Sequence, residues 1–106
     1  EEIFGPVACV IPFKSFNEVM NSANDTPFGL SAVLWTKDLS RALQFVEEIE
    51  AGFVQVNQCV APRANVSYGG IKMSGLGKEY AFDSMMNHFT QSKTILINRG
   101  KSIIDV

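Results

Sequence analysis

Three short apolar runs alternate with two stretches of helical periodicity in the first half of this 106-residue chain. Runs of this length are typical of strands, and a continuous apolar run fits a strand that is covered on both faces. When a helix connects two strands of one sheet, the crossover is right-handed and the strands are parallel. The alternation therefore predicts an α/β fold with a parallel βαβαβ core, whose strands are residues 7–13, 30–35 and 53–57.

Helix start and stop signals surround the two helical stretches. Ser15 is a suitable N-cap for the first helix, with Glu18 three residues later as in a capping box, and the turn-forming residues 24–27 end it near Asn24. The second helix begins at Thr36 or Asp38, and its apolar positions fall mostly on one face. We expect Gly52 to mark its C-terminus.

The second half of the chain is dominated by a polar, glycine-rich loop at residues 58–77. A loop of this length exceeds what a compact domain uses to connect two elements, so it is either functional or loose. A further helix is predicted at residues 78–88 and a final strand at residues 94–98. We therefore divide the chain into residues 1–90, a strand region at 91–98 and a polar tail at 99–106.

Composition excludes several classes of function. Nine Lys and Arg against 11 Asp and Glu give a net charge of −2, whereas nucleic-acid binding requires a concentrated basic face. The longest apolar run, residues 7–13, is far shorter than the roughly 20 residues of a membrane span. Cys9 and Cys59 have no metal-ligand spacing and suggest no disulfide framework. We expect no metal, a cytoplasmic location, and small molecules and proteins as partners.

Four blocks, at residues 1–7, 23–32, 51–57 and 68–79, resemble in order and spacing the C-terminal part of the NAD(P)-dependent aldehyde dehydrogenase superfamily. The resemblance extends from Glu1 to Asn98. Members of that family are several times longer, and the chain starts at Glu1 inside the first block rather than at Met. We therefore expect it to be a C-terminal fragment of such an enzyme.

The resemblance implies roles for five residues. Glu2 matches a carboxylate that accepts hydrogen bonds from the hydroxyls of the nicotinamide ribose, and Phe4 matches an aromatic beside the nicotinamide of NAD or NADP. Cys59, Arg63 and Tyr68 match a loop that walls the aldehyde site. The final strand matches a segment that pairs between subunits, which implies a homo-oligomer.

The residues alone leave alternatives open. Cys9, placed within a predicted strand, should be buried and inert. Cys59 is either a wall residue or a modifiable thiol. Arg63 either binds a carboxylate on the aldehyde through its guanidinium fork or is a solvated loop residue. Phe4 by spacing alone is a core aromatic.

Two functions follow. In the first, the chain is part of an oxidoreductase that converts an aldehyde to a carboxylic acid with NAD or NADP through a cysteine thioester. The resemblance then places the nucleophilic cysteine, the general base and the dinucleotide-binding fold upstream of Glu1, so the fragment alone should be inactive. In the second, a truncated gene encodes a small α/β binding or interaction module without catalysis.

Overall fold

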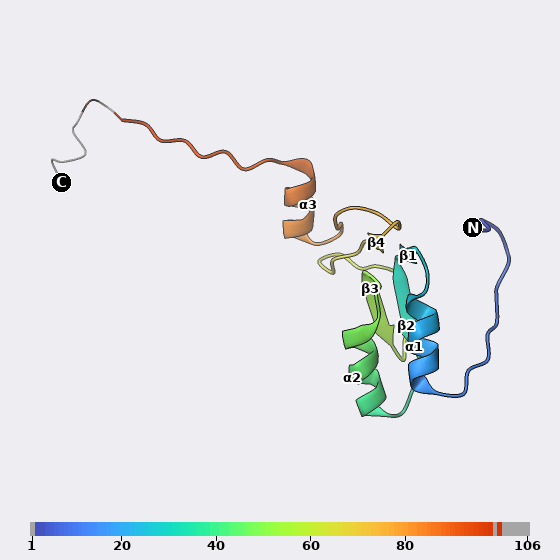
Figure 1. Ribbon diagram of the computed structural model, residues 1–106. Coiled ribbons are helices and arrows are strands. Elements are labelled where there is room, and N and C mark those ends of the chain that lie inside the picture. Colours follow the sequence, from blue (N-terminus) through green and yellow to red (C-terminus); the bar gives the residue numbers. More distant parts are fainter. Residues whose placement is uncertain (1, 99, 101–106) are drawn as a thin grey trace.

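A parallel βαβ unit forms the body of the molecule in the computed structural model, which describes residues 2–98 and residue 100 (Figure 1). Its strands pair in register from Ser31 opposite Phe53 to Leu34 opposite Val56, and a helix connects them. The predicted α/β class and this crossover are confirmed. The elements of the unit, with the helix that precedes it, are α1 (Phe16–Asn24), β2 (Ser31–Leu34), α2 (Leu39–Glu48) and β3 (Phe53–Val56).

Both helices begin at the caps that the sequence predicts. The Ser15 Oγ accepts a hydrogen bond from the Glu18 amide at 3.2 Å. The Asp38 Oδ1 accepts from the amides of Ser40 and Arg41 at 2.9 and 3.2 Å, which decides between the two candidates for the start of α2. Helix α1 ends at Asn24, where the turn-forming residues begin.

A second, antiparallel pair of strands joins the long loop to the segment between α1 and β2. Strand β1 (Phe28–Gly29) pairs with β4 (Ile71–Lys72), so that Phe28 lies opposite Lys72. An isolated bridge joins Tyr68 to Glu79. The predicted loop at residues 58–77 is thus folded back onto the βαβ unit. Helix α3 (Phe82–Phe89) starts four residues later than expected, because Glu79 takes part in the bridge.

The expected first strand, residues 7–13, does not form. These residues are extended and exposed, and Val10 is 92% accessible. A strand needs a neighbour for its N–H and C=O groups, and none of the described residues supplies one. Cys9 is consequently exposed rather than buried, which corrects the prediction made for it. Figure 1 shows this N-terminal segment running apart from α1 and β2.

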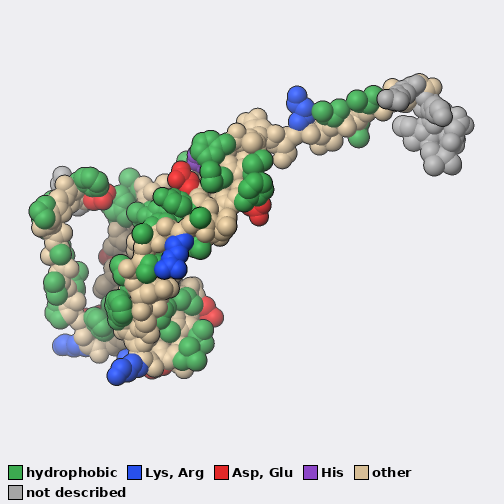
Figure 2. Space-filling view, turned by 180° about the vertical axis from the view of Figure 1, so that it is seen from behind, with side chains coloured by type: hydrophobic (Ala, Val, Ile, Leu, Met, Phe, Trp, Pro, Cys, Tyr) green, Lys and Arg blue, Asp and Glu red, His purple; other side chains and the backbone are tan. Residues whose placement is uncertain are grey.

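The C-terminal segment also extends away from the body, beyond α3 (Figure 1). Residues 94–98 form no strand with any described part of the chain, and Leu96 is 92% exposed. Hydrophobic side chains lie open along both extended segments (Figure 2). The predicted polar tail, residues 99–106, lies outside the described residues except for Gly100.

The buried core is small. Met20 and Phe45 are the buried hydrophobic residues, one on each of the helices α1 and α2. The accessible surface is 9353 Å², whereas a compact protein of this mass exposes about 5,900 Å². The radius of gyration is 21.3 Å, against about 13 Å for a compact chain of this length. Within residues 2–98 and 100, no helix has the length and apolarity needed to cross a membrane.

Candidate functional site

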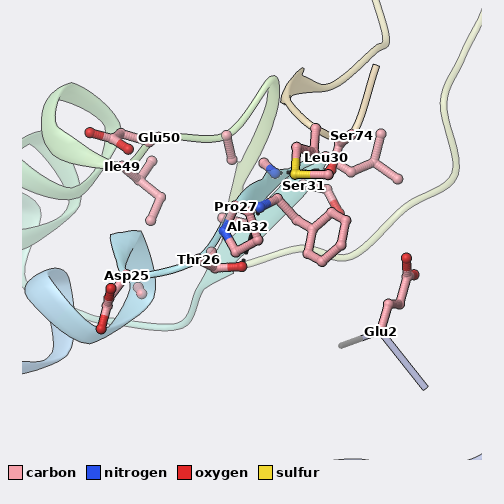
Figure 3. A pocket seen from close by; sticks show the side chains of 15 residues that line it. Glu2, Asp25, Thr26, Pro27, Leu30, Ser31, Ala32, Ile49, Glu50 and Ser74 are labelled. Atoms are coloured by element: carbon pink, nitrogen blue, oxygen red, sulfur yellow. Dashed lines mark hydrogen bonds between the residues drawn. The ribbon is translucent and has the colours of Figure 1, made fainter.

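An open hollow of about 910 Å³ lies beside β1 and β2, with Glu2 facing it from the N-terminal segment (Figure 3). Small-molecule sites span roughly 300–1,000 Å³, so the hollow is large enough for part of a dinucleotide. The loop between α1 and β2 provides the largest share of its wall, residues 25–30. The other lining residues are Glu2, Ala23 of α1, Ser31 and Ala32 of β2, residues 49–51, Met73 and Ser74.

Lys72 fastens this loop to the rest of the fold. Its ammonium donates to the carbonyl oxygens of Asn24 at 2.9 Å and Thr26 at 3.1 Å, and it forms an ion pair with Glu50. The side-chain nitrogen of Asn24 in turn donates to the Glu48 carbonyl oxygen at 2.8 Å, and its side-chain oxygen accepts from the backbone amide of Glu50 at 2.9 Å. The ends of both helices and β4 are therefore joined at one point next to the hollow.

Gly29 allows the loop to pass close to its neighbours. Its amide donates to the Ser74 Oγ at 2.9 Å, and a Cβ at this position would come within 2.6 Å of the Glu50 carbonyl oxygen. A side chain is therefore excluded. The next residue, Leu30, is 41% exposed and places an apolar side chain on the wall of the hollow.

Glu2 offers two acceptor oxygens toward the hollow, which suits a vicinal diol such as a ribose. Figure 3 shows its side chain across the hollow from Pro27 and Leu30. Phe4 is 99% exposed and is not among the lining residues described for this hollow, so its spacing-based interpretation as a core aromatic is wrong. Glu2, Asp25 and Glu50 each place a carboxylate on this hollow, a set of acceptors that suits the hydroxyls of a ribose.

A separate group of contacts holds the start of the loop that carries Cys59 and Arg63. Asn57 has a φ of 54°, a conformation that Asn tolerates better than most residues. Its side-chain amide pairs with the backbone of Thr36 through two hydrogen bonds of 2.8 Å. The buried Gln55 accepts from the Val60 amide at 2.9 Å.

The three residues predicted to wall the aldehyde site differ in how far neighbouring residues hold them in place. Cys59 and Arg63 are exposed on the loop after β3. Tyr68 is half-buried, its ring packs edge-to-face on Phe53 with centroids 5.2 Å apart, and its backbone pairs with Glu79. Of the five residues predicted for the site, only Glu2 lines the hollow in the described part of the chain, so the cofactor-side and substrate-side residues are not brought together.

Two lysines that hold these regions together were not predicted from the sequence. Besides Lys72, the Lys78 ammonium donates to the carbonyls of Gly52 at 3.1 Å and Gly69 at 2.8 Å. Gly52 does not cap α2, which ends four residues earlier; a Cβ there would lie 1.9 Å from the Gly69 carbonyl oxygen. Both lysines lie in the block at residues 68–79 that resembles aldehyde dehydrogenases. That resemblance is the one sequence signal that pointed to this segment. Within the described chain, no group of three or more His, Cys, Asp and Glu side chains is placed to hold a metal ion.

The family model for the aldehyde dehydrogenase family matches residues 1–95, and the chain belongs to that family. The mouse 2-aminomuconic semialdehyde dehydrogenase is 44% identical over 97 residues, which is 92% of this chain and 20% of the relative. The betaine aldehyde dehydrogenase of Sinorhizobium fredii is 44% identical over 101 residues, 95% of this chain and 20% of its own length. The chain thus spans about a fifth of these relatives.

Solved structures give the same result. Apo betaine aldehyde dehydrogenase from Staphylococcus aureus, a G234S mutant, superposes with a TM-score of 0.86 at 32% identity, over 98% of this chain and 21% of that one. An aldehyde dehydrogenase from Bacillus cereus, solved as an NAD⁺ complex, gives a TM-score of 0.85 at 36% identity, over 93% of this chain and 20% of that one. The α/β assignment and the family therefore agree.

Proposed function

We propose that this chain is the C-terminal segment of an NAD- or NADP-dependent aldehyde dehydrogenase, which oxidises an aldehyde to a carboxylic acid. The observation that carries the proposal is the family match over residues 1–95 at about a fifth of the relatives' length. The Bacillus cereus enzyme, solved as an NAD⁺ complex, supports a nicotinamide dinucleotide as the cofactor.

Glu2 and Phe4 are the proposed cofactor contacts. When bound, the nicotinamide supplies the acceptor for the hydride that leaves the aldehyde carbon. The Glu2 carboxylate would accept hydrogen bonds from the two ribose hydroxyls and so restrict the orientation of the cofactor, and Phe4 would pack against the nicotinamide ring. The position of Glu2, which lines the hollow across from Leu30, supports this role.

Cys59, Arg63 and Tyr68 are the proposed wall of the aldehyde site. Arg63 is the residue that can select a substrate, because a guanidinium binds a carboxylate through two parallel hydrogen bonds. In this arrangement Arg63 favours an aldehyde that carries a second, acidic group. Tyr68 presents an aromatic ring whose position is fixed by Phe53.

The remaining parts of the enzyme are proposed to lie outside these residues. The nucleophilic cysteine, the general base and the dinucleotide-binding fold belong to the rest of the parent enzyme, so residues 1–90 complete a site that they cannot operate alone. Residues 91–98 are proposed to pair with another subunit. Their exposed Leu96 and Ile97 support a role in association.

The test uses the full-length enzyme that contains this segment. We expect it to form reduced cofactor with an aldehyde and NAD or NADP, and we expect Glu2→Gln to lower kcat/KM by about 1–3 kcal/mol of transition-state stabilisation. Glu47→Gln, a change at an exposed carboxylate on α2, is the matched control. Failure of the wild-type enzyme to oxidise aldehydes with either cofactor would refute the proposed function. Equal effects of Glu2→Gln and Glu47→Gln on kcat/KM would refute only the proposed role of Glu2 as a cofactor contact.

A further inference from the structure

Tyr80 has a backbone conformation that its side chain disfavours. Its φ is 69°, in the left-handed region, and bulky residues there are uncommon because Cβ crowds the backbone. The residue connects the Tyr68–Glu79 bridge to α3, so the chain turns sharply at this point. A glycine would make the same turn without strain. The turn alone therefore does not account for a tyrosine at this position.

The ring of Tyr80 packs on Tyr68, a proposed substrate residue. The ring centroids are 6.0 Å apart and the planes are 87° apart, an edge-to-face arrangement that aromatic pairs favour. Tyr68 also packs on Phe53 at 5.2 Å. The Tyr68 ring is thus located by two aromatic neighbours, one at the start of β3 and one at the entrance to α3.

The backbone of Tyr80 holds the same loop. Its carbonyl oxygen accepts a hydrogen bond from the Asn65 amide at 2.9 Å. The adjacent Glu79 exchanges two backbone hydrogen bonds with Tyr68, of 3.0 and 2.7 Å. The loop after β3, which carries the proposed substrate residues, is therefore held at its C-terminal end by Glu79 and Tyr80. Asn57 holds its N-terminal end.

We propose that Tyr80 is a positioning residue for the aldehyde site, acting through the ring of Tyr68. This inference rests on the proposed function. In the absence of the Tyr80 ring, Tyr68 has one aromatic neighbour instead of two and occupies several orientations. Aldehyde binding must then also order the Tyr68 ring, which costs free energy. The affinity for the aldehyde is therefore lower, while the affinity for the cofactor is unchanged.

Tyr80→Gly in the full-length enzyme separates this role from a purely structural one. The substitution relieves the backbone strain and also removes one aromatic pair, and because these effects are similar in size and opposite in sign, we expect the thermal midpoint to change little. We expect KM for the aldehyde to rise about two- to thirteenfold, the range that corresponds to losing one aromatic pair, with KM for the cofactor unchanged. Tyr80→Asn, which also tolerates this φ and lacks the ring, should behave similarly.

Two controls complete the experiment. Tyr80→Phe keeps the ring and should restore the wild-type KM, whereas Phe82→Ala removes an aromatic ring that is 70% exposed two residues away and should change neither KM. The inference is overturned if the aldehyde KM is the same in the Gly and Asn variants as in wild type. It is also overturned if both KM values rise together with a lower thermal midpoint. Wild-type enzyme that oxidises no aldehyde refutes the proposed function and this inference with it.

Discussion

Replacing Lys72 by Met in the full-length enzyme should loosen the loop between α1 and β2, which lines the hollow proposed to hold the cofactor. The Lys72 ammonium holds two loop carbonyls, at 2.9 and 3.1 Å, and pairs with Glu50. Methionine has a similar length and apolar stem but provides no donor. The substitution therefore removes all three polar contacts while it retains most of the packing.

The magnitude follows from exposure. The Lys72 side chain is 24% exposed, so its two bonds to carbonyls count as charge-assisted hydrogen bonds, each about 1.5–3 kcal/mol and not fully additive. The Glu50 side chain is 54% exposed, so the ion pair adds only about 0–1 kcal/mol. Water can solvate the freed carbonyls in part. We expect a loss of about 2–3 kcal/mol in the local opening free energy of the loop.

Hydrogen exchange measures this loss directly. The Gly29 amide, bonded to Ser74, and the Met73 amide, bonded to Pro27, should lose protection by about 30- to 150-fold, and the cofactor should bind more weakly. Glu50→Gln is the matched control, because it removes the ion pair and leaves the two carbonyl contacts. If Lys72→Met changes protection no more than Glu50→Gln, the carbonyl contacts do not hold the loop and the reasoning is refuted.

Three further predictions concern the proposed enzyme. Arg63→Ala should lower kcat/KM for aldehydes that carry a carboxylate about tenfold or more relative to neutral ones; an unchanged ratio would exclude selection by Arg63. Leu96→Lys should shift the enzyme toward smaller assemblies in sedimentation velocity, since it places a charge on the segment proposed to pair between subunits; an identical distribution would contradict that pairing. The 106-residue chain alone should form no reduced cofactor with any aldehyde; turnover that disappears in Cys59→Ala would show that the chain carries its own nucleophile.

The parts of the fold that were predicted correctly depend on local chemistry. The caps at Ser15 and Asp38 bond to amides two or three residues away, so their signals are contained in a few neighbouring positions. The β2–α2–β3 crossover follows from an alternation that is also local, because two adjacent parallel strands need a long connection between them and a helix is the usual one. These features need no knowledge of the rest of the structure.

The parts that were missed depend on distant contacts. Gly52 was interpreted as a helix cap, yet the Gly69 carbonyl, 17 positions later, is what excludes a side chain there. Gln55 lies in a strand beside two valines and is buried, and its amide oxygen is satisfied there by the Val60 amide of the following loop. The role of Lys72 could not be predicted from its neighbours in sequence, because its partners are Asn24 at the end of α1, Thr26 in the following loop and Glu50.

The missing first strand limits the cofactor site more than any single contact does. Glu2 and Phe4 precede residues 7–13, which run extended without a partner in the described chain. A side chain that must hold a ribose within hydrogen-bonding distance has to be carried by fixed backbone, since small misplacements greatly reduce catalysis. Phe4, at 99% exposure, shows how little of this support comes from the described residues. A protein surface that covers residues 7–13 would supply the missing strand neighbour and fix the cofactor contacts in the same step.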